Sequence, residues 1–199
     1  TFTFALSRSF VLIFSDCLLA AKIAASFMRF SRSAPEYPTV AFANAFKSTS
    51  SSNVFAMYER LINAIPLWLF YEPGQDYPAD VKKFCGVGTS QNIKKMVPRE
   101  CNIQTGSARN PDSTRSASAA MVHLTEEAFF PATEQWTPEK VVNSAISAVP
   151  VAPYSFVVRE STPNGKNAFY DEWQKTKTIN PSTGKPMSAY KGVFVAWFE

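Results

Sequence analysis

Short apolar runs alternate along the chain with stretches of helical spacing, and this alternation predicts an α/β fold. Residues 119–124 are apolar apart from one histidine and too few for a helix, so they predict a buried strand. Thr137 and Pro138 then form a helix start signal, and an apolar face follows from Val141 to Val149. Residues 154–159 read as another strand. The segment 120–159 therefore predicts strand, helix, strand, with the two strands parallel.

The N-terminal part predicts one further strand and two helices. Residues 10–14 read as a short buried strand, and a helix is expected from there to residue 30. Residues 31–52 are expected to be irregular and to end in a mobile serine-rich loop near residues 47–52. A second helix is expected to begin near Asn53, with Met57, Leu61 and Ile65 on one stripe and Pro66 as its limit.

The rest of the chain predicts two more strands and one more helix. A strand pattern covers residues 101–105, and a polar surface loop is expected over residues 106–118. A helix is expected over residues 167–177, with its aromatic side chains packed inward. Residues 192–198 form a last apolar strand pattern, whereas residues 86–97 predict no definite element.

Length and composition narrow the class of protein. The chain has 199 residues, of which 46% are hydrophobic and 18% charged, so it fits one globular domain and is neither disordered nor embedded in a membrane in its bulk. The apolar run at residues 10–21 contains Asp16 and is followed by Lys22, which argues against a secretory signal or a membrane span. A net charge of +4 is compatible with a polyanionic partner but does not establish one.

Cysteine and histidine usage favours neither a zinc site nor a histidine base. Cys17, Cys85 and Cys101 form no C-x-x-C pair, which is typical of reduced thiols in a cytosol-like compartment. His123 is the single histidine and lies inside the strand predicted at residues 119–124. A packed or hydrogen-bonded core histidine is the favoured interpretation over a catalytic base.

Candidate chemistry lies where the two neighbouring strands end. Glu126 and Glu127 follow the first strand, and residues 160–165, with two hydroxyls and a Pro-Asn-Gly turn, follow the second. Because the carboxyl ends of parallel strands line the ligand crevice of an open sheet, these groups are expected at one rim. Two plainer interpretations stay open: the acids complement the start of a helix, and the turn is only a turn.

Three separated segments together resemble the large terminase subunit, the DNA-packaging motor ATPase of tailed bacteriophages. Residues 121–131 resemble its Walker B segment, and residues 160–165, followed by residues 167–170 and Trp173, resemble its coupling motif and the helix after it. Residues 190 and 193–198 are similar to the aromatic strand that comes next. The resemblance implies a P-loop NTPase-like fold of the additional-strand type, with a mostly parallel sheet, helices on both faces, and residues 1–199 as part of an ATPase domain.

The resemblance also implies ATP and Mg²⁺ as ligands and assigns roles to five residues. Glu126 would activate the attacking water or organise the metal, and Thr125 stands where many relatives have a first acid. Ser161 and Thr162 match the coupling segment, where hydroxyls could sense the γ-phosphate. Arg115, in the loop before the central strand, would contact phosphate or a neighbouring subunit.

The implied partners are double-stranded DNA, the portal and the small terminase subunit. A homo-oligomeric ring in the host cytoplasm, engaged for a time at the procapsid portal, is the implied assembly. No membrane association is expected.

One departure from the family pattern bears on nucleotide binding. No G-x-x-x-x-G-K-[ST] sequence, the phosphate loop, occurs in the chain, so the chain by itself is expected to bind ATP poorly. The family's nuclease domain is also missing, and we therefore expect a central piece of a larger polypeptide, or a processed or degenerate copy.

Two alternatives to the motor ATPase remain. The first is a nucleotide-independent scaffold or interaction domain that keeps the fold. The second is a hydrolase that uses Glu126 with Glu127 or Glu160. Adjacent residues on an extended strand point to opposite faces, which makes Glu126 and Glu127 a poor catalytic pair.

Overall fold

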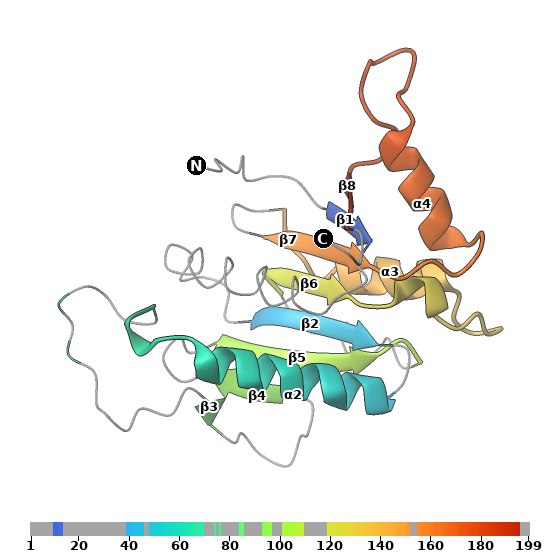
Figure 1. The fold of residues 1–199 in the computed structure, drawn as a ribbon. Helices are drawn as coiled ribbons and strands as arrows, with labels where there is room; N and C mark the ends of the chain where they lie inside the picture. Colours follow the sequence, from blue (N-terminus) through green and yellow to red (C-terminus); the bar gives the residue numbers. More distant parts are fainter. Residues whose placement is uncertain are drawn as a thin grey trace.

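The computed structural model describes residues 10–13, 39–45, 48–69, 74, 76, 84–85, 93–96, 101–109, 119–151 and 155–195. These residues build one eight-stranded sheet in the order β3-β4-β5-β2-β6-β7-β1-β8 (Figure 1). The predicted α/β class with a mostly parallel sheet is therefore confirmed.

The parallel part of the sheet has six strands: β1 (Phe10–Ile13), β2 (Thr39–Ala45), β5 (Cys101–Ser107), β6 (Met121–Leu124), β7 (Phe156–Glu160) and β8 (Lys191–Phe194). Two short strands, β3 (Phe84–Cys85) and β4 (Ile93–Met96), extend it by antiparallel pairing along the edge of β5. The predicted parallel pairing of β6 with β7 is confirmed, with Val122 opposite Val157.

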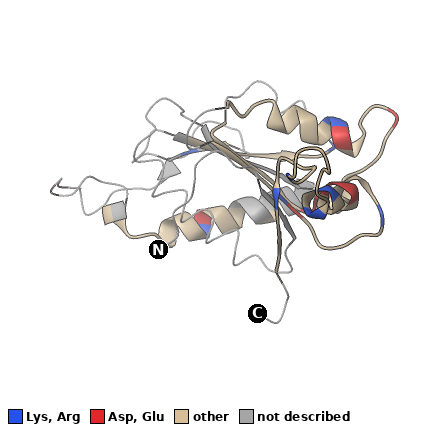
Figure 2. Ribbon diagram, turned by 90° about the horizontal axis from the view of Figure 1, so that it is seen from above, with Lys and Arg blue, Asp and Glu red and all other residues tan. Residues whose placement is uncertain are grey.

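Helices cover both faces of the sheet, as the view in Figure 2 shows. The α-helices are α2 (Ser48–Ala64), α3 (Pro138–Ile146) and α4 (Ala168–Lys177), and two 3-10 helices are η2 (Leu67–Leu69) and η5 (Glu127–Phe129). In Figure 1, α2 lies in front of the sheet and α3 behind it.

The core of the site-bearing half lies between α3 and strands β6 and β7. Val122 and Leu124 are fully buried against Val141 and Ala145 of α3, and Val157 of β7 completes the layer. Because side chains alternate along a strand, His123 lies on the opposite face, toward α2. Because of this alternation, some polar side chains of β6 and β7 lie on the α3 face of the sheet and others lie on the α2 face.

The predicted helix starts are confirmed at α3 and α4. The Thr137 side chain accepts a hydrogen bond from the backbone N–H of Lys140, with Pro138 in the first helical position. The Asn167 side chain accepts one from the backbone N–H of Tyr170. Each cap satisfies an N–H group that the helix itself leaves unpaired.

The expected irregular stretch over residues 31–52 is wrong in two places. Residues 39–45 form β2, a strand inside the parallel sheet, and the serine-rich residues 48–52 form the first turns of α2 rather than a mobile loop. Serine in a helix costs only about 0.5 kcal/mol relative to alanine. Docking of the later turns on the sheet, through the buried side chains of Tyr58 and Ile62, outweighs that cost.

Several other predictions differ from the structure or lie outside the described residues. Strand β5 extends to Ser107, two residues into the expected polar loop, and β4 lies in the stretch that predicted no definite element. The helix expected after β1 and Arg115 fall outside the described residues. Within the described part of the chain, none of the helices combines the length and apolar character that a membrane span requires.

Candidate functional site

The ends of β6 and β7 bring the predicted site segments together. The two strands are parallel neighbours, with Leu124 opposite Arg159, so the residues that follow each strand emerge at the same edge of the sheet. On the β6 side these are Thr125 and Glu126. On the β7 side they are Ser161 and Thr162.

Glu126 is held directly by the two hydroxyl residues. Its Oε2 accepts hydrogen bonds from Oγ1 of Thr162 at 3.0 Å, from the backbone N–H of Thr162 at 3.4 Å, and from Oγ of Ser161 at 3.4 Å. The carboxylate is half-buried, and Ser161 is fully buried. The sequence-predicted cluster of an acid and two hydroxyls is therefore a physical contact.

The backbone at Glu126 is strained. Its φ of 54° and ψ of 42° place it in the left-handed region, and it is the single non-glycine residue with positive φ in the described part of the chain. A non-glycine residue in this region costs on the order of 1–2 kcal/mol. The turn reverses the strand alternation, so that Glu126 points to the β7 loop while Glu127 points into the interior.

Glu127 is buried and paired with Arg159. It is 3% exposed, and its carboxylate accepts two hydrogen bonds from Arg159, at 2.8 Å from Nε and 2.5 Å from Nη2. The Arg159 guanidinium also lies over the Tyr190 ring, 5.0 Å from its centroid. With its carboxylate committed to this pair, Glu127 is not free to act with Glu126.

The buried carboxylate of Glu127 keeps Arg159 ionised. Burial alone would lower the pKa of Arg159, but its hydrogen bonds to Glu127 and the negative charge of that residue raise the pKa above its ordinary value. Burial also raises the pKa of the Tyr190 hydroxyl, although the neighbouring Arg159 opposes the shift. The pair therefore forms a fixed support under the turn at Glu126.

The Pro-Asn-Gly turn after β7 is fastened to η5. The side chains of Asn164 and Asn167 both donate to the backbone oxygen of Ala128 at 3.0 Å, and the backbone N–H of Ala128 donates to Oγ of Ser161 at 3.1 Å. Gly165 has φ of 67°, a conformation that suits glycine in such a turn. Three contacts thus bind the residues after β7 to Ala128, two positions after Glu126.

Three residues that support the rim could not be recognised from the sequence: Arg159, Asn164 and Asn167. Arg159 lies inside a strand pattern, and nothing in that pattern pairs it with Glu127. Asn164 and Asn167 stand within the segments that resemble the coupling motif, but only the fold shows that both side chains reach Ala128.

The interpretation of His123 as a hydrogen-bonded core residue agrees with the structure. The side chain is 4% exposed, and its Nδ1 lies 2.7 Å from the Tyr58 hydroxyl of α2. Its Nε2 lies 3.4 Å from Oε1 of Glu160. Burial, and secondarily the charge of Glu160, raise the pKa of Tyr58 above its ordinary value.

Few protein groups at this rim could ligate a metal ion. Among the described residues, no group of three histidine, cysteine or acidic side chains is placed to hold a metal ion. Magnesium commonly uses one or two carboxylates together with nucleotide phosphates and waters. At this rim Glu126 supplies one carboxylate, whose Oε2 already accepts hydrogen bonds from Ser161 and Thr162.

No protein-family model matches the sequence, and no curated protein matches it either. Two solved structures are similar to this chain. The large terminase ATPase domain of Thermus phage P74-26 matches the chain with a TM-score of 0.50 and 17% sequence identity. A point mutant of that domain matches it with a TM-score of 0.51 and 18% sequence identity. Each match covers 97% of this chain and 77% of the solved chain.

The chain has the fold of a phage large terminase ATPase domain. In this fold the strand order places β6 between β2 and β7, and β7 between β6 and β1, in the parallel part of the sheet. At 17–18% identity the likeness concerns the fold.

Proposed function

We propose that this chain is the ATPase core of a terminase-like motor that couples ATP hydrolysis to the packaging of double-stranded DNA into a procapsid. The observation that carries the proposal is the contact of Glu126 with Ser161 and Thr162 at the carboxyl edge of two parallel strands. The terminase-like fold supports it. A portal, a small terminase subunit, a homo-oligomeric ring and the host cytoplasm belong to the same proposal.

In this proposal Glu126 is the catalytic residue. Its carboxylate lies half-buried at the rim, where it can accept a hydrogen bond from the attacking water and orient it. Bound Mg²⁺ would supply neutralisation of the charge that develops on the phosphate oxygens. Glu126 would organise the ion indirectly, and Thr125 would act on it through an intervening water.

Ser161 and Thr162 are the coupling residues. Both hydroxyls donate to the Glu126 carboxylate, and Ser161 also accepts from the backbone N–H of Ala128. When the charge next to Glu126 changes on hydrolysis, these hydrogen bonds weaken or strengthen together. The β7 loop, and α4 that follows it, would then shift relative to η5.

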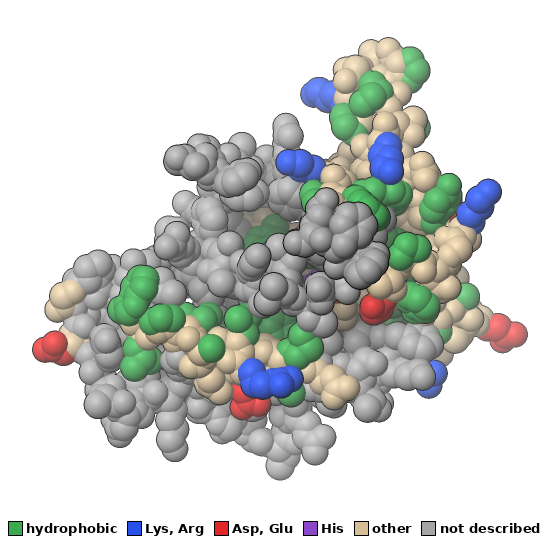
Figure 3. All heavy atoms as spheres, in the orientation of Figure 1, with side chains coloured by type: hydrophobic (Ala, Val, Ile, Leu, Met, Phe, Trp, Pro, Cys, Tyr) green, Lys and Arg blue, Asp and Glu red, His purple; other side chains and the backbone are tan. Residues whose placement is uncertain are grey.

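The exposed lysines of α4, of the loop after it and of the first position of β8 suit a DNA partner. Lys175, Lys177, Lys185 and Lys191 are exposed, and Figure 3 shows basic side chains over α4 and the loop that projects from it. Lys175 lies 3.7 Å from Glu172, which leaves the other three as the main positive charges. Exposed lysines attract phosphate without reading sequence. Arg115 remains a proposed contact to phosphate or to a neighbouring subunit.

The decisive test is ATP turnover of the full-length protein with Glu126→Gln. The substitution keeps the size and the hydrogen-bonding oxygen but removes the charge, so we expect kcat to fall at least about 100-fold. Glu139→Gln, at an exposed position in the first turn of α3, is the matched control and should retain activity. Unchanged turnover in Glu126→Gln would remove Glu126 from the catalytic role.

A nucleotide-independent scaffold is the second candidate function. One observation favours it: the 199 residues contain no phosphate-loop sequence. In this alternative the contacts of Glu126 with Ser161 and Thr162 only brace the sheet edge. The two candidates differ in whether nucleotide stabilises the fold.

A further inference from the structure

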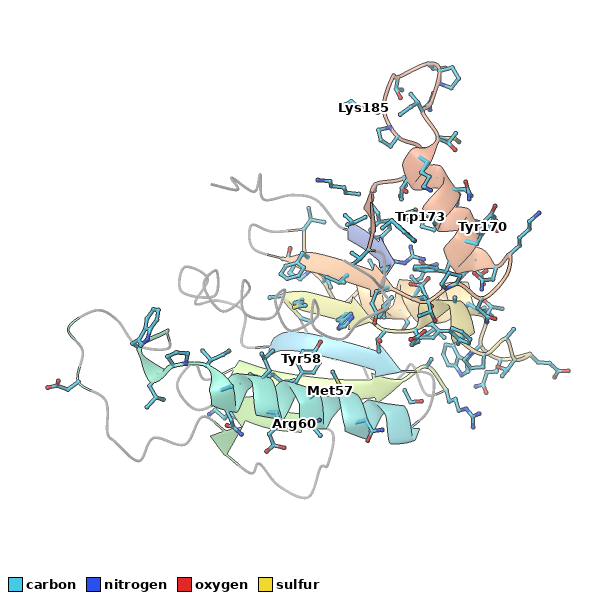
Figure 4. The ribbon with its side chains drawn as sticks, viewed as in Figure 1. Met57, Tyr58, Arg60, Tyr170, Trp173 and Lys185 are labelled. Atoms are coloured by element: carbon cyan, nitrogen blue, oxygen red, sulfur yellow. The ribbon has the colours of Figure 1, made fainter. Side chains whose placement is uncertain are left out.

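Three buried polar side chains connect α2 to the rim where Glu126 lies. The Tyr58 hydroxyl lies 2.7 Å from Nδ1 of His123 on β6, and Nε2 of His123 lies 3.4 Å from Oε1 of Glu160, the last residue of β7. None of the three is more than 9% exposed. Figure 4 shows Tyr58 on the side of α2 that faces the strands.

The two contacts fit a single tautomer of the imidazole. A Glu160 carboxylate can only accept, so the proton of a neutral His123 belongs on Nε2. Nδ1 is then an acceptor, and the Tyr58 hydroxyl donates to it. Tyr58 remains a donor, because burial and the charge of Glu160 keep its pKa above its ordinary value. Both ring nitrogens thus have a partner of the right kind.

Glu160 links this network to the catalytic rim. It is joined by a peptide bond to Ser161, whose hydroxyl contacts Glu126 and accepts from Ala128. A buried carboxylate without a partner is strongly unfavourable, so loss of His123 would force Glu160 to turn toward water. That movement would displace the start of the β7 loop.

We infer that His123 is a positioning residue: oriented by Tyr58, it acts through Glu160 to hold the Ser161–Thr162 segment in place against Glu126. The catalytic part of this inference rests on the proposed function, whereas the two contacts of His123 rest on the geometry alone. Helix α2 and the rim share one network. A displacement of α2 therefore changes how firmly Glu126 is held.

Nitrogen NMR of the imidazole tests the network without any assay of activity. His123 is the single histidine of these 199 residues, and its signals are assigned by their loss in His123→Gln. We expect a protonated Nε2 and an unprotonated Nδ1. Tyr58→Phe should shift the Nδ1 resonance, whereas the matched control Tyr170→Phe, which removes a hydroxyl from α4, should not. A proton on Nδ1, or no response to Tyr58→Phe, would overturn the network.

Steady-state kinetics of the full-length protein test the positioning role. His123→Leu removes both contacts, and we expect kcat to fall about 10-fold while KM for ATP changes less than about 2-fold. His123→Gln keeps an amide donor near the position of Nε2 and should recover most of the loss. Tyr58→Phe, which keeps the aromatic packing, should lower kcat about 3-fold.

The pattern of effects separates positioning from simple support of the fold. Thermal unfolding of each variant accompanies the kinetics, and if His123→Leu does not fold, His123→Gln and Tyr58→Phe carry the test. Unchanged kcat in Tyr58→Phe, or equal loss in the leucine and glutamine variants, overturns the positioning role. Absence of ATP turnover in the unsubstituted protein contradicts the proposed function instead and, with it, the catalytic part of this inference. The NMR result still decides the network.

Discussion

At the scale of single residues, the turn at Glu126 depends on the buried ion pair of its neighbour. Arg159 donates two hydrogen bonds to Glu127, and both side chains are almost fully buried. Arg159→Leu would leave a buried carboxylate without its partner. We expect it to lower the free energy of unfolding by about 3–5 kcal/mol, measured by chemical denaturation.

A double variant provides the control for this prediction. Glu127→Gln combined with Arg159→Met removes both charges and should recover much of the lost stability, because the penalty comes from the unpaired charge rather than from the missing pair. A loss below about 1 kcal/mol in Arg159→Leu would show that Glu127 reaches water or another partner.

The sequence predicted which acid and hydroxyl residues lie at the rim, but not that Glu126 and Glu127 point to different surroundings. Glu126 and Ser161 could be predicted because each directly follows an apolar strand pattern. That Glu127 points inward depends on the left-handed backbone of Glu126, which no local pattern specifies for a glutamate. The partners Arg159 and Tyr58 are 32 and 65 residues away from the side chains they contact, beyond the range of periodicity.

At the scale of elements, α4 and β8 are packed too closely at Gly192 for any side chain. A Cβ there would lie 2.4 Å from Oγ1 of Thr176 and 2.9 Å from Cζ3 of Trp173. We expect Gly192→Ala to destabilise the protein by about 1–3 kcal/mol, through overpacking, in thermal or chemical unfolding. Adding Thr176→Ala removes the nearer obstacle and should restore part of the stability. A neutral Gly192→Ala would mean that α4 moves away from β8 at little cost.

Element types were predicted well where packing and local signals agree. The starts of α3 and α4 carry caps and one apolar face each, and both were predicted to within about one residue. Strand β2 and the first turns of α2 were missed, because Ala-rich and Ser-rich stretches have no clear period. Their structure is decided by pairing with β5 and β6 and by docking on the sheet, which are tertiary effects.

At the scale of the whole molecule, different buried side chains on the two faces of the sheet stabilise the rim where β6 and β7 end. On the α3 and α4 side, Arg159 and Glu127 fix the turn that directs Glu126. On the α2 side, His123 fixes the end of β7 through Glu160. Ligand that binds at the rim would contact segments held from both faces, so binding should stabilise the entire sheet rather than one loop.

The response of thermal stability to nucleotide separates the two candidate functions. If the chain is an ATPase core, MgATP at about 100 times its Kd should stabilise the full-length protein by about 2.7 kcal/mol. In a thermal scan this corresponds to an increase in Tm of about 5–10 °C for a domain of this size. Glu126→Gln should retain the shift, because the variant removes catalytic charge rather than the phosphate contacts. Mg²⁺ alone and adenosine with inorganic phosphate are the controls. A protein whose Tm does not respond to MgATP, while its unfolding stays cooperative, is the nucleotide-independent scaffold.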